Sequence, residues 1–325
     1  MAEQTDQPNQ ISWQGVLAGA SAAVFYTLAN VFLRELAVNI DFVAVVFLKA
    51  VITATIFVPW LYMMQRQTGK RVLPRGKYLL VMVFGALVSQ FLGNVGQQLA
   101  FGIIGIAVSV PVLIGSLVAS SAILGYLFLK ENISTGVAIS LAILVCSVAL
   151  LSCGGEAASD SVKDEQALTS LAEIPFAIGI AAGIGCGIAY AVLGVCIRYV
   201  LTSEVPRQTP IVIVSLTGVI GFGATLLIRD GFADFASFDL QTWGMMLGAG
   251  LSNAVAFFCL STALKLLPVV YVNAINVSQV AMAAAIGVLL FSEPLSAWLA
   301  IGLTLMVLGF GMLARFTASS VQAPD

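Results

Sequence analysis

Long apolar runs that are almost free of charge constrain this chain more than any other feature. One of them, "FVAVVFLKAVITATIFVPW" from Phe42 to Trp60, holds a single charged residue, Lys49. About 20 such residues in helical form cross the hydrocarbon core of a bilayer, and only helices or closed barrels satisfy their backbone groups there. The runs are continuous rather than alternating, which excludes the pattern of a barrel. Charged residues make up 9% of the chain, against about 25% in soluble domains, so we expect an all-α integral membrane protein.

The apolar runs divide into ten expected transmembrane helices. Charged, polar or glycine- and proline-containing segments separate them, as is typical of connections. Two of the connections are expected to be tight turns, one around Gly102 and one between Lys265 and Pro268. The expected spans cover residues 12–33, 42–64, 78–100, 104–129, 134–153, 174–197, 210–228, 242–264, 267–291 and 295–314.

The distribution of Lys and Arg predicts the orientation of these spans, because cytoplasmic loops are rich in basic residues. With the N-terminus inside, ten basic residues fall in cytoplasmic segments and three fall outside. The segment "QRQTGKRVLPRGK" (65–77) supplies five of the ten. The tail "MAEQTDQPNQ" lacks the basic region with which a cleaved signal peptide begins. Both termini are therefore expected in the cytoplasm.

The two halves of the chain resemble each other. The polar segment 154–173 separates a first unit of five spans, 12–153, from a second, 174–316. "GASAAVFYTLANVFLRELA" (19–37) aligns with "GIGCGIAYAVLGVCIRYVL" (183–201), and "LFLKENIS" aligns with "LLFSEPLS". Because five is odd, the second unit must enter the membrane from the opposite face, as in the inverted repeats of many secondary transporters. We expect two inverted five-helix repeats, a polar linker, and cytoplasmic tails at 1–11 and 317–325.

These features together resemble the EamA-type members of the drug/metabolite transporter superfamily. The resemblance rests on the ten spans, the two halves, the "FLKENIS"/"FSEPLS" element and a basic residue early in the second span, and it covers about residues 12–315. It implies a multi-pass protein of the inner (cytoplasmic) membrane that moves small metabolites, often amino acids, through a central cavity by alternating access. It also implies that the cavity is lined mainly by helices 1, 3, 4, 6, 8 and 9.

The third span carries a stripe of amides. Gln90, Asn94, Gln97 and Gln98 are spaced at i, i+4, i+7 and i+8, so they share one face of a helix. Such amides can also serve as hydrogen bonds between packed helices, each contributing under about 1 kcal/mol. Four of them on one stripe favour the wall of a wet cavity that binds a polar substrate.

Two later spans supply further candidates for substrate binding. The eighth span places Asn253 and Phe257 on the stripe that matches the amides, and the ring of Phe257 could equally be a packing residue. The ninth span places Asn273, Asn276 and Gln279 on one arc of a helix. One polar and one partly aromatic wall suit a small polar or zwitterionic, amino-acid-like metabolite.

Matched residues of the two repeats are candidates for gating. Tyr26 aligns with Tyr190 and Arg34 with Arg198; the tyrosine pair could alternatively pack symmetrically. Glu131 and Glu293 each lie three residues before a serine at the start of the next helix. For both we expect a local role at that helix N-terminus, where free N–H groups and the helix dipole favour a carboxylate.

Lys49 is the residue least expected in its surroundings. It lies seven residues after the start of the second span, about 10 Å deep at 1.5 Å per residue. Its ammonium group could extend toward the membrane surface along its own stem. Alternatively it faces a water-filled cavity, where the absence of carboxylates within the spans leaves it to bind an anionic group of the substrate.

Several function classes lack the residues they need. The chain has no histidine and no Asp or Glu within a span, so an intramembrane enzyme, a cation exporter and a metal site are not expected. The sequence contains no GxxxxGK[ST] motif, so neither ATP nor another cofactor is expected, and no basic aromatic patch suggests nucleic acid. The expected partners are a small-molecule substrate and the lipid bilayer, with a homo-oligomer left open. The alternative function is a lipid or lipid-carrier flippase of the same fold.

Overall fold

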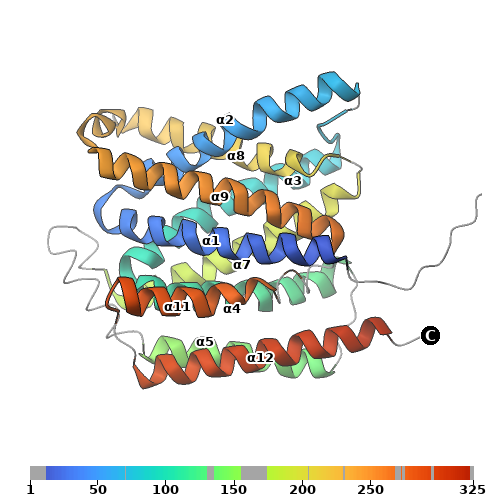
Figure 1. Cartoon of the computed structure of the whole chain (residues 1–325), viewed down its shortest axis with the longest axis vertical. Helices are drawn as coiled ribbons and strands as arrows, with labels where there is room; N and C mark the ends of the chain where they lie inside the picture. Colours follow the sequence, from blue (N-terminus) through green and yellow to red (C-terminus); the bar gives the residue numbers. More distant parts are fainter. Residues whose placement is uncertain are drawn as a thin grey trace, which may run out of the picture.

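The computed structural model describes residues 12–69, 71–129, 135–154, 174–203, 205–229, 231–267, 272, 275–293 and 296–322. In these residues it is a bundle of helices with no strand (Figure 1). The first half contains α1 (Trp13–Asn39), α2 (Phe42–Thr68), α3 (Lys77–Val88), the π-helix η1 (Ser89–Asn94), α4 (Val95–Leu129) and α5 (Thr135–Gly154). The second half contains α7 (Phe176–Leu201), α8 (Gln208–Ile228), the short 3-10 helix η3 (Gly231–Ser237), α9 (Leu240–Leu266), α11 (Ser278–Leu290) and α12 (Ala297–Gln322).

Length and composition make six helical stretches of the described residues able to cross a membrane: Trp13–Asn39, Phe42–Thr68, Lys77–Phe128, Phe176–Leu201, Gln208–Ile228 and Leu240–Leu266. Three shorter apolar helices accompany them, within α5, α11 and α12. The bundle turns large apolar side chains outward, including Leu80, Phe128 and Leu289. Such a surface suits a lipid environment, in which apolar side chains need no cover.

Gly105 divides the longest of these stretches into two helical segments. The stretch has 52 residues, which would be roughly 80 Å long if straight, more than twice the hydrocarbon core. Gly105 has φ 69° and ψ 177°, in a region that residues with a Cβ rarely adopt. A Cβ at this position would also collide with the carboxylate of Glu293. The turn therefore needs glycine and lies at Gly105; the expectation that it lies at Gly102 was wrong, because Gly102 is still helical.

The packing of the helices is consistent with exchange of the two halves. The most extensive pairs are α4 with α7, α1 with α9, α5 with α12 and α2 with α8; in addition α4 packs on α11, and α3 and η1 pack on α7. The sequence repeat relates α1 to α7, α2 to α8 and α5 to α12, and it relates α9 and α11 to the third and fourth spans. Exchanging the two halves turns the contact between α1 and α9 into the contact between α7 and the third span. The contacts of α2 with α8, of the fourth span (the second part of α4) with α11, and of α5 with α12 are each turned into themselves. The packing thus repeats the similarity that the sequence shows.

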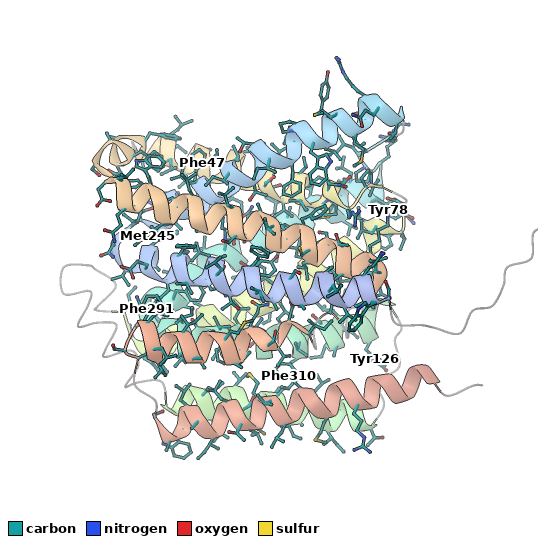
Figure 2. The ribbon with its side chains drawn as sticks, in the orientation of Figure 1. Phe47, Tyr78, Tyr126, Met245, Phe291 and Phe310 are labelled. Atoms are coloured by element: carbon teal, nitrogen blue, oxygen red, sulfur yellow. The ribbon has the colours of Figure 1, made fainter. Side chains whose placement is uncertain are left out.

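The two ends of the bundle can be told apart in the figures. The start of α1 and the end of α12 lie at one end, which we call the terminal end (Figure 1). The α2–α3 connection lies there as well, and its Val72 carbonyl accepts a hydrogen bond from the Thr209 hydroxyl at the start of α8. The opposite end, which we call the distal end, holds the α1–α2 connection and Phe291, whereas Tyr78 and Tyr126 lie toward the terminal end (Figure 2).

Candidate functional site

A cavity in the middle of the bundle brings most of the candidate residues together. It holds about 1230 Å³ of empty space, counting the part that opens to the surface. The helices α1, α2, α4, α7, α8, α9 and α11 line it, together with η1. Helix α2 contributes Lys49 and Thr53, and α8 contributes Ser215. The cavity therefore includes the second and seventh spans in addition to the six helices that the family resemblance implies.

Lys49 faces this cavity rather than the membrane surface. Its side chain is buried, with 6% of the residue exposed. The ammonium Nζ donates a hydrogen bond of 2.5 Å to Oδ1 of Asn94. The ion pairs found in the described part of the chain join Arg34 to Glu293 and Arg229 to Asp41, so Lys49 takes part in neither. A buried ammonium has three donors, and one neutral amide oxygen leaves both hydrogen-bonding capacity and charge for a ligand.

A backbone carbonyl determines how the amides beside Lys49 are oriented. The carbonyl oxygen of Val214 can only accept, so Gln90 must turn its Nε2 toward it, at 2.7 Å. The Oε1 of Gln90 then faces Nδ2 of Asn94, which donates at 2.5 Å. Asn94 consequently presents Oδ1 to Lys49. These hydrogen bonds thus form a series with a fixed donor and acceptor at each step, from the α8 backbone to the ammonium group.

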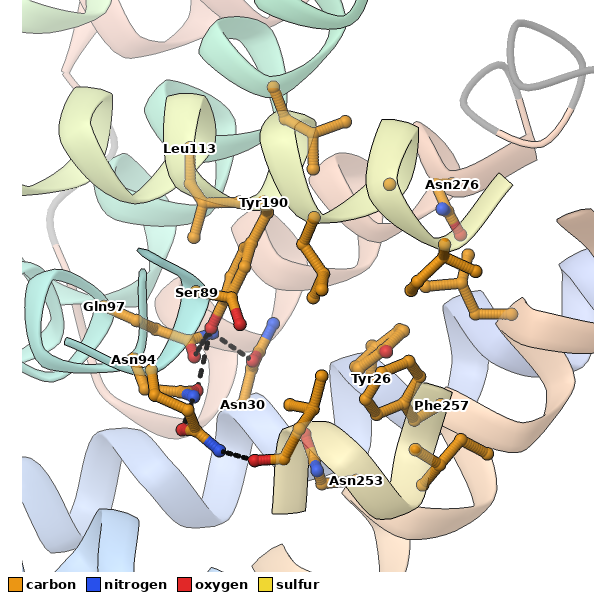
Figure 3. A pocket seen from close by; sticks show the side chains of 18 of the residues that line it. Tyr26, Asn30, Ser89, Asn94, Gln97, Leu113, Tyr190, Asn253, Phe257 and Asn276 are labelled. Carbon is orange, nitrogen blue, oxygen red and sulfur yellow. Dashed lines mark hydrogen bonds between the residues drawn. The ribbon is translucent and has the colours of Figure 1, made fainter. Parts of the chain in front are cut away.

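Tyr190 connects this series of hydrogen bonds to a second pair of amides. Its hydroxyl lies 2.9 Å from Oδ1 of Asn94 and 3.0 Å from Oε1 of Gln97, and one proton can be donated to only one of them. Gln97 donates from Nε2 to Oδ1 of Asn30 at 3.0 Å. These contacts gather on one side of the cavity (Figure 3). The result is a buried polar surface on which Lys49 carries the only formal charge among the described lining residues.

The remaining walls are mostly apolar. The rings of Tyr26 and Phe257 lie close to each other, on the same side of the view as Asn276 (Figure 3). Leu113 lines the cavity from the second part of α4. Toward the terminal end, the lining reaches Leu264 in the last turn of α9 and Ile211 in the first turn of α8. A small molecule with one polar end and an apolar body fits such a lining.

The structure places the sequence candidates as follows. The lining contains ten of them: Tyr26, Lys49, Gln90, Asn94, Gln97, Tyr190, Asn253, Phe257, Asn276 and Gln279. Gln98 does not line the cavity; it is buried, and neither polar atom of its amide has a hydrogen-bond partner. Arg198 is partly exposed and also outside the lining. Asn273 lies outside the described residues, as does Glu131.

Several lining residues were not predicted from the sequence, although the helical spacing of two of them indicated that they face the cavity. Asn30 follows Tyr26 by four residues and Thr53 follows Lys49 by four, so each shares a helix face with a candidate. Ser89 had no such signal, because it lies in the π-helix η1. The i→i+5 pattern of a π-helix brings Ser89 and Asn94 to the same side, and both line the cavity.

A second buried cluster closes the bundle near its distal end. Glu293, 1% exposed, accepts hydrogen bonds from the backbone N–H groups of Ile106 at 2.8 Å and Ala107 at 2.7 Å. It also accepts from Nε of Arg34 at 3.4 Å, and the guanidinium lies 5.0 Å from the centroid of the Phe291 ring. We call these groups the distal cluster. Because Arg34 is buried and paired there, α1 continues to Asn39, past the expected end of the span at residue 33.

The expected local role of Glu293 was therefore wrong. Its carboxylate satisfies the first free N–H groups after the break at Gly105, on a different helix of the other half. The local capping role belongs to Ser296, whose Oγ accepts from the N–H of Leu299 at 3.1 Å. A pattern of neighbouring residues cannot reveal a partner that is almost two hundred positions away.

Comparison with known proteins agrees with this architecture. The model of the EamA-like transporter family matches the chain twice, over residues 13–153 and 177–315. In all, 28 solved chains match. One of them, titled "Crystal structure of protein", has a TM-score of 0.60 and 15% identity, with 96% of this chain and 99% of that chain covered. At that identity the likeness shows a shared fold and nothing about a substrate. None of the curated proteins matches.

Proposed function

Because this chain belongs to the EamA-like transporter family and is therefore a membrane transporter of small molecules, we propose that it is a secondary transporter of a small polar or zwitterionic, amino-acid-like metabolite. Members of this family are transporters and not enzymes. The proposal includes ten spans arranged as two inverted repeats, for which the exchange-consistent packing of α1 with α9 and of α7 with the third span is the support.

The observation that carries the proposal is Lys49. Its ammonium group faces the cavity and binds a neutral amide. Leaving a buried charge without an opposite charge is unfavourable, and a carboxylate of the substrate would supply one. Around it, the hydroxyl of Tyr190 and the amide of Asn30 offer hydrogen bonds to neighbouring polar groups. The apolar walls at Leu113 and Phe257 then take an uncharged side chain.

The two ends of the cavity support transport by alternating access. The distal cluster fills the space between α1, α4 and the end of α11 with an ion pair and its hydrogen bonds. The lining reaches the terminal turns of α8 and α9 at the other end. In this proposal the described arrangement faces the terminal end, and a second arrangement, with the distal cluster separated, faces the distal end.

The orientation in the membrane can be measured with single cysteines in a background without the native ones. We expect Gln67→Cys, beside the basic α2–α3 connection, and Ala236→Cys, in η3, to react from opposite sides, because these exposed residues lie at the terminal and distal ends. An impermeant maleimide added to intact cells should label Ala236→Cys alone, since the basic loop is cytoplasmic. Labelling of both cysteines would refute cytoplasmic termini with two inverted repeats.

Transport itself is tested by counterflow in proteoliposomes. A panel of amino acids and short organic acids is first screened by thermal stabilisation, because a ligand at 100 times its dissociation constant adds about 2.7 kcal/mol to the stability of the protein. For the ligands found, excess unlabelled ligand inside should drive transient accumulation of labelled ligand from outside, without ATP. Equal signals in vesicles without protein would exclude transport, and movement of lipid analogues in place of the ligands would favour a flippase.

A further inference from the structure

The cavity has a second polar region, far from Lys49, that the proposed function does not use. Asn276, two residues before the start of α11, lines the cavity and is 6% exposed, and its buried Oδ1 has no hydrogen-bond partner among the described residues. Gln279, three residues later and in the first turn of α11, lines the cavity as well. Almost all buried polar groups in proteins are paired, so an unpaired carbonyl oxygen facing a cavity indicates a missing donor.

The two polar regions belong to helices on different sides of the bundle. Helix α2, which carries Lys49, packs on α8 and α9, while α11 packs on α1 and α4. In Figure 1 α9 and α1 lie between α2 and α11. Those two intervening helices contribute Phe257 and Tyr26 to the lining. Figure 3 likewise shows Asn94 and Asn276 on opposite sides of the cavity. The order across the cavity is therefore ammonium, apolar and aromatic section, amide oxygen.

From this order we propose that the ligand is elongated, with a carboxylate at Lys49 and a hydrogen-bond donor, such as an ammonium or amide group, at Asn276. The inference rests on the proposed function, because it takes the Lys49 region as the carboxylate site. It adds that the donor is separated from the carboxylate by an apolar segment. An α-amino acid carries both groups on one carbon, so its ammonium group cannot reach Asn276 while its carboxylate binds Lys49. Ligands of the ω-amino acid type satisfy both ends.

The test compares ligands that differ in one end at a time, using equilibrium binding to the purified full-length protein. The probes are γ-aminobutyrate, ε-aminocaproate and ω-aminocaprylate, with caproate lacking the donor and hexylamine lacking the carboxylate. We expect ε-aminocaproate or ω-aminocaprylate to bind about tenfold or more tightly than caproate or hexylamine. Tenfold corresponds to about 1.4 kcal/mol, close to the typical contribution of one hydrogen bond to a charged group. Asn276→Leu should reduce the ratio of ε-aminocaproate to caproate affinity about tenfold.

Two further variants test whether the effect of Asn276→Leu is specific to the proposed donor site. Ser261→Ala removes another buried polar atom without a partner, on α9 and outside the lining, and should leave that ratio unchanged. Asn276→Asp keeps the size of the side chain and should raise the ratio, so the inference remains testable if the leucine variant does not fold. Equal affinities of ε-aminocaproate and caproate would overturn the inference alone. Binding of no carboxylate, or binding unaffected by Lys49→Met, would instead overturn the proposed function.

Discussion

Replacing Lys49 with methionine should abolish recognition of carboxylate ligands while the protein still folds. Methionine matches the length and apolar stem of lysine and is compatible with the buried surroundings of the side chain. The loss should be about 100-fold or more in affinity, because truncating one partner of a buried, hydrogen-bonded charge pair costs about 2–5 kcal/mol. Thermal stabilisation by the best carboxylate ligand, and counterflow of the same ligand, are the measurements.

Two companion variants separate charge from shape. Lys49→Arg keeps the charge and should retain part of the response. Asn94→Asp should weaken binding almost as much as Lys49→Met, since the new carboxylate would occupy the position of Oδ1, 2.5 Å from the ammonium group, and neutralise it internally. Normal carboxylate transport in Lys49→Met would assign Lys49 to folding alone. Undiminished binding in Asn94→Asp would show that the ligand does not use the charge.

Among the variants proposed for this protein, removal of the Glu293 carboxylate should produce the largest loss of folding stability. Glu293→Ala removes the carboxylate that pairs with the buried guanidinium of Arg34 and leaves two backbone N–H groups uncapped. Breaking a buried ion pair from one side costs about 3–5 kcal/mol. We expect a strong decrease in the apparent midpoint of thermal unfolding in detergent, or failure to accumulate in the membrane. Glu293→Gln should lose less stability than Glu293→Ala, because the amide oxygen of glutamine can still accept a hydrogen bond from one N–H group.

The exposed ion pair offers a matched control for this variant. Arg229 and Asp41 are 54% and 35% exposed and 3.3 Å apart, and such pairs contribute about 0–1 kcal/mol. Arg229→Met should therefore change the midpoint little. In addition, Arg34→Met combined with Glu293→Gln should be less destabilised than the two single changes added together, because both changes remove the same interaction between Arg34 and Glu293. Additive losses would contradict the coupling of Arg34 to Glu293.

Features that depend on local pattern could be predicted from the sequence. The helical spans follow from uninterrupted apolar runs, and the positions of Asn94 and Gln97 in the cavity follow from their spacing on a helix. The position of Lys49 at the cavity could also be predicted, because a charge in an apolar run needs a polar partner. The turn at Gly105 was misplaced by three residues, since the local sequence offers glycine at both 102 and 105 and the contact of Gly105 with Glu293 comes from the other half.

Features that depend on contacts between the halves could not be predicted. The role of Glu293 depends on backbone groups near Gly105, and the inclusion of α8 in the cavity depends on how it packs on α2. The spacing of the amides predicts that both Asn94 and Gln98 line the cavity. This is correct for Asn94, but Gln98 is enclosed by packed residues. Helical periodicity identifies a shared face but not how far along the helix the cavity extends.

The hydrogen bonds around Lys49 link the affinity of the site to the arrangement of the halves. Gln90 and Asn94 belong to the first half, but Val214 and Tyr190, which hold them, belong to the second. If α8 moves relative to η1, Gln90 loses the acceptor that orients it, and its amide and that of Asn94 become free to rotate. The site would then bind its ligand less tightly in the second arrangement. A ligand shifts an equilibrium between two states only by its difference in affinity for them, so the Val214 carbonyl helps to determine which state the bound protein populates.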